Sequence, residues 1–405
     1  MKLLCLSLLM ATSCFSSEVN LGNEVLARSG FKALQGKRVG LITNPSGVNR
    51  NLQSTIDVLR RAPGVQLAAL FGPEHGINGD IPAGDKIGNR TDERTGLPAY
   101  SLYGATHKPT PEMLKGLDAL VYDLQDTGCR SYTFISTMGV AMEAAGEAGI
   151  EFIVLDRPNP LGGARVEGPM VENKYRSFVS KWDVPYVYGL TCGELARMIN
   201  GEHWISNCCK LTVIPLKGWK RSMVWRDTAL PWVLTSPHVP HGESPLFQVA
   251  TGMLGEIGGV STGIGYTLPF QCIAAPGLDP QKTAEIMNAY RLPGVRFNPI
   301  TYKPYYFAFK DQQLGGVEIY LTDPTRAPLT AINIYTLEAL KRMAGMDLFA
   351  EAARTNKTFS MFDKVNGTAA TREGLQAGKS AAEIVGSWKP KEEAFRKARK
   401  KYLLY

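Results

Sequence analysis

Four short, continuously apolar runs lie in the first part of the chain, and polar residues follow each of them. Runs of this length with β-branched residues predict strands that are buried on both faces. Helical patterns lie between the runs, so the strands are predicted to be parallel and to end at one edge. The runs and their polar followers are Val39–Ile42 with Thr43-Asn44, Leu67–Phe71 with Gly72–Gly76, Ala119–Tyr122 with Asp123–Asp126, and Phe152–Leu155 with Asp156–Asn159.

The carboxyl edge of this predicted sheet is the expected position of a binding cleft, because ligands of open α/β sheets bind there. A long glycine-rich segment, residues 72–103, starts at that edge. Loops of such length inside compact domains are usually functional or disordered, and its starting point favours function.

A second, smaller domain is predicted to begin near Ala275. The segment before it, residues 218–265, is rich in Trp, Pro and Gly and is expected to be irregular. The predicted fold class is α/β, with a Rossmann-like parallel sheet domain over residues 18–274 and an α+β domain over residues 275–405. The second domain is predicted to contain helices at Pro280–Tyr290 and Leu329–Met343, strands near Tyr305–Phe309 and Gly315–Tyr320, and a final helix.

Residues 1–17 have the layout of a secretory signal. Lys2 precedes the apolar run Leu3–Met10, and small residues follow before Cys14. The run is too short to span a membrane, and no other run is long enough, so no transmembrane segment is expected. The layout predicts export across the inner membrane to the periplasm, either free or lipid-anchored at Cys14.

Composition and missing motifs exclude several functional classes. The hydrophobic fraction of 44% and charged fraction of 20% are those of an ordinary globular protein. The absence of G-x-G-x-x-G, Walker A and G-x-S-x-G sequences argues against a dinucleotide cofactor, a nucleotide triphosphate and a serine esterase. No nucleic-acid-binding motif is present, and no cofactor is expected. The basic residues of Lys389–Lys401 indicate a solvated amphipathic helix or, alternatively, a surface for an anionic polymer. His238 and His241 lack a third ligand, so no metal is expected.

Glu74 is the leading catalytic candidate. It lies between Pro73 and His75-Gly76 at the end of a predicted strand. A carboxyl group held at such a turn can be partly desolvated, which raises its pKa and suits a general acid. The alternative is a helix cap or loop salt bridge. His75 is expected to orient Glu74, to bind substrate, or simply to make its hydrogen bonds within the loop.

A second polar cluster follows the Ala119–Tyr122 run. Asp123, Gln125 and Asp126 cost several kcal/mol to bury unless they are satisfied. Arg130 could neutralise these acids or receive an anionic group of a ligand, and Tyr132 follows it. An internal Asp–Arg network remains the alternative.

Glu167, in a Gly/Pro setting, offers another carboxylate. Two carboxyl groups flanking a bond are the minimum equipment for glycoside hydrolysis, so Glu167 and Asp123 are the candidates for a partner of Glu74. Asn159 is displayed by the stiff turn Arg157–Pro160, and Asn44 could bind a sugar amide or hydroxyl group. Whether the anomeric configuration is retained or inverted stays open.

Several long motifs resemble those of the exo-β-N-acetylmuramidase family, the NamZ-like bacterial peptidoglycan hexosaminidases. The likeness covers essentially the whole chain after the signal. The motifs are Gly40–Val48, Phe71–Gly76, Ser101–Gly104, Asp123–Thr133, Leu155–Pro160, Val166–Pro169 and Tyr402–Tyr405.

The resemblance implies a Rossmann-like domain, a smaller C-terminal domain and a cleft between them. It also implies release of N-acetylmuramic acid from the non-reducing ends of peptidoglycan glycans, with Glu74 at the position of the family's leading catalytic glutamate. On that reading Asp123, Arg130, Tyr132 and Asn159 fall on motif positions expected to line the cleft. Asn44, His75, Gln125 and Asp126 are further candidates for substrate binding.

The middle of the chain departs from this family pattern. Ser261–Gly265 stands where many members have Ser-Glu-Gly-Arg-Gly, and His238 stands where Asn is common. Charge is thereby lost from a loop expected to face the ligand, which leaves the glycan preference open. The rival hypotheses are a noncatalytic protein that binds cell-wall fragments and an esterase or amidase acting on such fragments.

Overall fold

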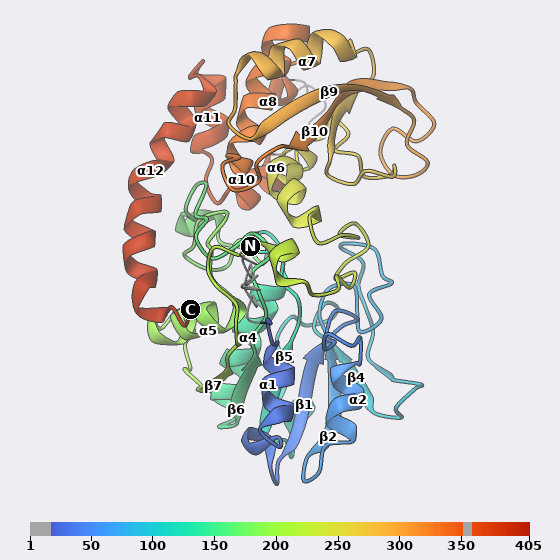
Figure 1. Ribbon diagram of the computed structural model, residues 1–405, viewed down its shortest axis with the longest axis vertical. Coiled ribbons are helices and arrows are strands. Elements are labelled where there is room, and N and C mark those ends of the chain that lie inside the picture. The colour runs from blue at the N-terminus through green and yellow to red at the C-terminus, as the bar shows by residue number, and fades with distance from the viewer. Residues whose placement is uncertain (1–17, 351–358) are drawn as a thin grey trace, which may run out of the picture.

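The first part of the chain folds around a seven-stranded sheet, which occupies the lower half of Figure 1. The computed structural model describes residues 18–350 and 359–405. The strand order is β3-β4-β2-β1-β5-β6-β7, and all pairings are parallel except that of β3 with β4. The strands are β1 (Arg38–Thr43), β2 (Gln66–Gly72), β3 (Arg90–Thr91), β4 (Pro98–Ser101), β5 (Ala119–Asp123), β6 (Glu151–Leu155) and β7 (Lys210–Ile214). The predicted α/β class is confirmed.

Helices cover both faces of this sheet. Successive side chains of a strand point to opposite sides, so each strand contributes to a core on each face. Leu120 and Tyr122 pack in a core with residues of α4 and α5, whereas Ala119 and Val121 pack in another core with residues of α1 and α2. This explains why the strands are apolar at every position. The helices of the first domain are α1 (Gly22–Arg28), α2 (Thr55–Arg60), α3 (Pro111–Leu114), α4 (Phe134–Glu147) and α5 (Cys192–Gly201).

The carboxyl ends of β2, β1 and β5 meet at one edge, as predicted. Ile42 pairs with Phe71, and Thr43 pairs with Asp123, so the three strands end almost in register. β2 follows β1 in the chain and lies on one side of it, whereas β5 comes later and lies on its other side. The direction in which successive strands are added to the sheet therefore reverses at β1. Such a switch point opens a crevice between the loops that follow the strands.

The second domain lies in the upper half of Figure 1 and is built on an antiparallel sheet of order β8-β10-β9. Its helices pack against this sheet and one another around a separate hydrophobic core. The elements are α6 (Ser244–Gly255), β8 (Cys272–Ala275), α7 (Pro280–Ala289), β9 (Val295–Tyr302), β10 (Leu314–Leu321), α8 (Leu329–Ala344), α10 (Ser360–Asn366), α11 (Ala370–Gln376) and α12 (Ala381–Ala398).

Three sequence-based expectations differ from the structure. The second core already includes α6 and β8, so the domain begins before residue 275, and residues 218–265 are not wholly irregular. The expected long loop of residues 72–103 contains β3 and β4, and β4 extends the large sheet beside β2. The strand expected at Tyr305–Phe309 is instead an exposed loop between β9 and β10.

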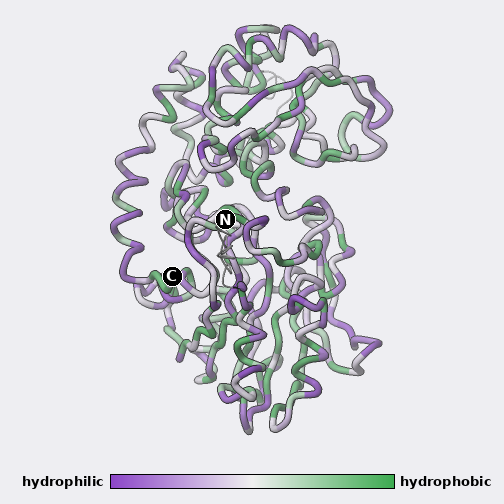
Figure 2. The backbone as a smooth tube through the Cα atoms, in the orientation of Figure 1, coloured by the Kyte–Doolittle hydropathy of each residue, from purple (hydrophilic) through white to green (hydrophobic). Residues whose placement is uncertain are grey.

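Helix α12 connects the two domains along one side of the molecule (Figure 1). Its sequence is largely hydrophilic in Figure 2, but Ile384, Trp388 and Phe395 are buried against the protein. This supports the amphipathic interpretation of the basic tail. Beyond it, the hydroxyl of Tyr405 donates to Asp156 Oδ2 at 2.7 Å, which ties the C-terminus to the end of β6.

The expected signal segment, including the candidate lipid attachment site Cys14, lies outside the described residues. Across residues 18–350 and 359–405, none of the helices has the length and apolar character needed to cross a membrane.

Candidate active site

Glu74 lies two residues beyond β2, in a turn whose backbone is tightly constrained. His75 adopts a left-handed φ of 70°, which is uncommon for a residue with a side chain and marks local strain. A Cβ atom at Gly72 would lie 2.9 Å from the backbone nitrogen of Ile77, so only glycine fits there. The turn thereby fixes the direction in which Glu74 leaves the sheet.

The Glu74 carboxylate is buried to 9% exposure, and each of its oxygens accepts a hydrogen bond from a neutral donor. The Gly84 N–H donates to Oε1 at 3.1 Å, and the Thr133 hydroxyl donates to Oε2 at 2.5 Å. Thr133 is the N-cap residue of α4, so the carboxylate faces the N-terminus of that helix. Both partners are uncharged, and among the described residues no Lys, Arg or His forms an ion pair with Glu74.

Two tyrosines lie close enough to Glu74 to respond to its charge. Burial, together with the charge of Glu74 and a hydrogen bond to it, raises the pKa of Tyr103 to about 12. Burial also raises the pKa of Tyr132, and the charges of Asp126 and Glu74 add to this effect. Both hydroxyls therefore stay protonated at neutral pH and can donate hydrogen bonds. Tyr132 lies within the electrostatic influence of both Glu74 and Asp126.

Asp126 is buried in the loop after β5, where the Gly128 N–H donates to its Oδ2 at 2.7 Å and the Tyr188 hydroxyl also donates to Oδ2. Burial raises its pKa to about 6, against the lowering effect of these hydrogen bonds. Oδ1 is buried and has no hydrogen-bond partner in the described protein. Since buried polar atoms are normally satisfied, Oδ1 is a candidate for contact with a ligand or water.

Asn44 and Gln125 belong to one hydrogen-bonded network that joins the loops after β1 and β5. Asn44 donates to the Thr235 carbonyl at 2.9 Å and accepts from Ser46, whose hydroxyl in turn accepts from the Gln125 N–H at 3.0 Å. The Thr235 hydroxyl donates to the Gln125 carbonyl at 2.7 Å and accepts from Tyr132 at 3.4 Å. Gln125 Oε1 is buried without a partner in the described protein, so it remains a candidate ligand contact. Asn44 mainly positions the loops.

The expectation that Asp123 is a catalytic partner of Glu74 is corrected, because both of its carboxylate oxygens are bound in a buried hydrogen-bond network. Arg157 Nε donates to Oδ1 at 2.5 Å, and both groups are almost completely buried. Thr55 Oγ1 and Asn23 Nδ2 donate to Oδ2 at 2.5 and 3.3 Å. Both carboxylate oxygens are occupied and Asp123 has no exposed surface, so it is a structural residue.

The expectation that Arg130 and Asn159 contact a ligand is also corrected. Arg130 is fully buried, and its guanidinium donates to Ser180 Oγ and to the carbonyls of Pro169, Val184 and Val365. It ties the second domain to the first and has no surface open to a ligand. Asn159 donates to the Leu190 carbonyl and accepts from the Leu161 N–H, each at 2.9 Å, which stabilises its own turn.

Glu167 lies at the seam between the domains, where both of its carboxylate oxygens are occupied. Its Oε1 is paired with Arg165, and its Oε2 accepts from the Thr330 N–H at 2.9 Å at the start of α8. Its contacts share no residue with those of Glu74. The expectation that Glu167 pairs with Glu74 is therefore corrected.

His75, the residue after Glu74, lies near His238. His75 Nδ1 lies 2.7 Å from the Ile81 carbonyl, which orients the ring. Burial and, secondarily, the nearby His75 lower the pKa of His238, so its ring is favoured in the neutral form. Within the described chain, no three His, Cys, Asp or Glu side chains gather as a metal-ligating group.

Sequence reasoning missed Thr133, Tyr103 and Thr235 as members of this site. Thr133 was recognisable as a possible cap, because it closes the Asp123–Thr133 motif just before a helical pattern. Tyr103 lies in the Ser101–Gly104 motif, which carried no chemical signal of its own. Thr235 is more than a hundred residues away from Gln125, and no local pattern connects the two.

Comparisons with known proteins agree with this architecture. The family model "Exo-beta-N-acetylmuramidase NamZ, N-terminal" matches residues 39–243, and the corresponding C-terminal model matches residues 248–405. The chain is 44% identical over 388 residues to the peptidoglycan beta-N-acetylmuramidase NamZ of Bacillus subtilis (strain 168), covering 96% of this chain and 92% of that protein.

Two crystal structures of DUF1343 family proteins from Bacteroides fragilis NCTC 9343 share the fold. One is 49% identical with a TM-score of 0.88, and the other is 30% identical with a TM-score of 0.76. Each alignment covers 96% of this chain and 99% of the other. The family resemblance inferred from the motifs is confirmed.

Proposed function

We propose the following reaction for this chain, which belongs to the exo-β-N-acetylmuramidase NamZ family and is an exo-acting glycosidase. It hydrolyses the β-glycosidic bond that follows a terminal N-acetylmuramic acid and releases this sugar from the non-reducing ends of peptidoglycan fragments. The relative from B. subtilis is named for peptidoglycan and N-acetylmuramic acid, which supports this substrate.

Glu74 acts as the acid/base that protonates the glycosidic oxygen. The observation that carries this assignment is the surroundings of its carboxylate: it is nearly buried, hydrogen-bonded only to neutral donors and free of any described ion pair. A carboxyl group that no cation neutralises can pick up and release a proton within a catalytic cycle. Tyr103 and Thr133 hold it in place.

Asp126 supplies the second carboxylate. It shares Tyr132 with Glu74 as an electrostatic neighbour, and one of its oxygens has no described partner. With a pKa of about 6, it is mainly ionised at pH 7 and can assist an attacking water or stabilise positive charge at the sugar's anomeric carbon. Asp123 and Glu167, the partners expected from the sequence, have their oxygens committed elsewhere.

Gln125 is the candidate for recognising the N-acetyl group. Its buried Oε1 can accept a hydrogen bond from the acetamido N–H, whereas its Nε2 is held by the carbonyls of Asp126 and Pro158, each at 2.9 Å. An amide oxygen fixed in this way favours a substrate that offers a matching donor.

The decisive experiment compares wild type with Glu74→Gln on the β-linked disaccharide of N-acetylmuramic acid and N-acetylglucosamine. Released N-acetylmuramic acid is measured by liquid chromatography and mass spectrometry. Loss of the proton donor is expected to lower kcat by about 10³-fold, within the usual range for removal of a general acid. Asp85→Asn changes an exposed acid beside Gly84 in the same loop and is expected to keep full activity.

Two results would contradict the proposal. Binding of the disaccharide by wild type without any turnover would support the wall-fragment-binding rival. Full activity of the folded Glu74→Gln variant would remove Glu74 from the reaction.

We further propose that the enzyme acts in the cell envelope, because peptidoglycan lies outside the inner membrane and the layout of residues 1–17 is that of an export signal. Fractionation of cells that express the full chain tests this proposal, and a Cys14→Ala variant tests lipid attachment. Recovery of the protein in the cytoplasm would contradict the proposed location.

A further inference from the structure

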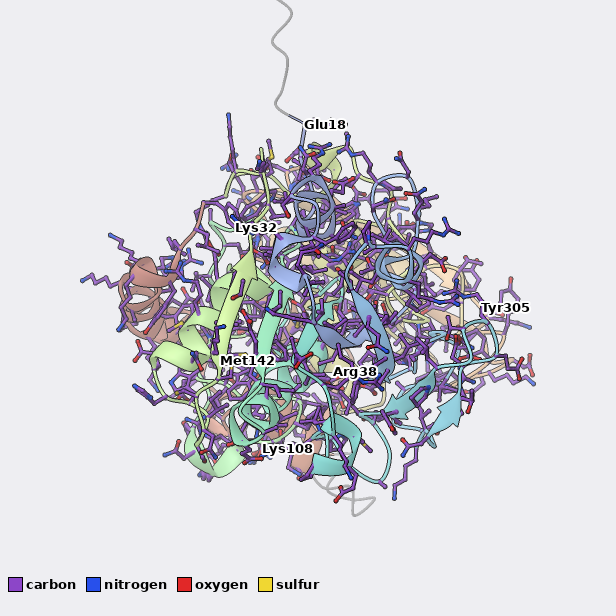
Figure 3. All side chains as sticks on the ribbon, turned by 90° about the horizontal axis from the view of Figure 1, so that it is seen from below. Glu18, Lys32, Arg38, Lys108, Met142 and Tyr305 are labelled. Atoms are coloured by element: carbon purple, nitrogen blue, oxygen red, sulfur yellow. The ribbon has the colours of Figure 1, made fainter. Side chains whose placement is uncertain are left out.

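The loop between β9 and β10 presents three consecutive aromatic side chains to solvent. Tyr305, Tyr306 and Phe307 are 64%, 49% and 71% exposed. The other strongly exposed large hydrophobic residues of the described chain occur singly along the sequence. Tyr305 lies at the periphery of the molecule in Figure 3. Such a concentration of exposed apolar surface is typical of a binding site.

This loop is held in place by the protein beneath it. The Tyr305 N–H donates to the Gly265 carbonyl at 2.7 Å, and a bond within the loop, from the Asp311 N–H to the Pro304 carbonyl at 3.0 Å, closes it on itself. The ring of Tyr266 lies 5.7 Å from that of Tyr305. A Cβ atom at Gly265 would lie 2.1 Å from the Tyr306 carbonyl oxygen, so the contact between these segments requires glycine.

The backbone of the loop is strained. Phe307, Phe309 and Asp311 have φ values of 65°, 61° and 62°. Bulky residues rarely adopt this left-handed conformation, and clusters of such residues are found at functional sites.

A direct contact with His238 brings the loop near the turn that carries Glu74. Tyr306 stacks on His238, with ring centroids 6.1 Å apart and an angle of 18° between the planes, and its hydroxyl lies 3.1 Å from His238 Nε2. His238 in turn lies near His75, which follows Glu74 in the sequence. The loop of the second domain therefore reaches the Glu74 site of the first.

We propose that Tyr305 and Phe307 form a stacking platform for the N-acetylglucosamine ring on the leaving-group side of the scissile bond. This inference rests on the proposed function. An exo-acting enzyme encloses the terminal sugar, so the rest of the glycan must leave the site on its open side, and the contact of Tyr306 with His238 brings this exposed aromatic loop near the Glu74 turn from the second domain. The C–H face of a pyranose ring is apolar and packs on aromatic rings, while its hydroxyl groups stay in water.

The test uses two substrates that share the terminal sugar and differ in the leaving group. One is the β-linked disaccharide with N-acetylglucosamine, and the other is β-N-acetylmuramyl fluoride, which has no ring to stack. The double variant Tyr305→Ser/Phe307→Ser is expected to lower kcat/KM for the disaccharide by about tenfold. Its kcat/KM for the fluoride is expected to stay within about twofold of wild type, which also shows that the variant is folded.

Tyr320→Ser is the matched control, since Tyr320 is an exposed tyrosine of β10 outside the loop and is expected to affect neither substrate. Equal losses on both substrates, or none on the disaccharide, would overturn the platform. A wild-type dimer that dissociates in the double variant, measured by sedimentation velocity, would identify the patch as a contact between copies and would also overturn it. Failure of wild type to hydrolyse either substrate would instead reject the proposed function itself.

Discussion

Glu74 and Asp123 occupy comparable positions at the edge of the sheet but have opposite surroundings. Each lies at the end of a strand beside β1, and each is nearly or completely buried. Asp123 is paired with Arg157 and has both oxygens occupied, whereas Glu74 accepts one hydrogen bond from Gly84 and one from Thr133.

This difference separates a structural carboxylate from the one proposed to carry out the chemistry. Burial of a charge is costly unless it is paired, so most buried acids are neutralised as Asp123 is. An acid held without a cationic partner is kept at a cost in stability, and such costs concentrate at functional sites. Removing the negative charge should therefore destabilise the protein strongly at Asp123 and have little effect on stability at Glu74.

The largest expected change in stability comes from Asp123→Asn. This substitution leaves the buried guanidinium of Arg157 without its counter-charge, which typically costs about 3–5 kcal/mol. Chemical denaturation monitored by tryptophan fluorescence measures the loss. Asp183→Asn, which breaks the surface pair with Arg176, is the control and should cost less than about 1 kcal/mol. Glu74→Gln should change stability far less than Asp123→Asn, and a reversal of this order would refute the comparison.

Asp126 lies between these extremes, and its contribution to stability depends on pH. Its pKa is about 6 in the folded protein against an ordinary value of 3.8, so the folded state holds more protons than the unfolded state between these values. Stability from this group is therefore lost as pH rises from about 4 to 6. A shift of about two units corresponds to up to about 3 kcal/mol.

The measurable quantity is the unfolding free energy of Asp126→Asn minus that of wild type, determined from pH 4 to pH 7. It should rise with pH over this range, because the variant no longer carries the group that loses its proton. The same difference for the exposed-acid variant Asp85→Asn should stay flat. A flat curve for Asp126→Asn would show that Asp126 does not titrate in this range.

The smallest expected effect comes from Thr133, whose hydroxyl donates to Glu74 Oε2 and which we expect to position that carboxylate. Thr133→Val keeps the shape of the side chain and removes the hydrogen bond to Oε2, so kcat should fall about tenfold while KM stays near the wild-type value. Thr133→Ser restores a hydroxyl and should recover most of the loss. A rise in KM with unchanged kcat would indicate a role in binding instead.

The central strands and the helix starts were predictable because their signals are local. β5 and β6 coincide almost completely with the apolar runs, and the capping box at Thr191 marks the start of α5. The prediction of a strand at Tyr305–Phe309 was wrong, because aromatic residues are typical both of strands and of binding surfaces. Helix α6 was missed because Pro245 and the surrounding glycines suggested irregular structure, although proline is favoured in the first turn of a helix.

The candidate site was only half predictable. The sequence placed Glu74, Gln125, Asp126 and Tyr132 at the same edge, and the structure joins them: the charges of Glu74 and Asp126 act on Tyr132, and hydrogen bonds link Gln125 to Asp126 and Thr235. It gave no means of separating Asp126 from Asp123, since both are acids in the same short motif.

The order of apolar and polar residues thus determined the α/β fold and the edge at which the polar residues gather, because periodicity and turn chemistry act over a few neighbouring positions, and it made Glu74 the leading candidate for the catalytic acid. Which of those polar residues remain available for chemistry was decided by tertiary structure. Arg157 reaches Asp123, Arg130 binds carbonyls of both domains, and Tyr306 reaches His238 across the domain boundary. These contacts join segments far apart in the chain, so the charge state and accessibility of each side chain follow from packing and not from its sequence neighbours.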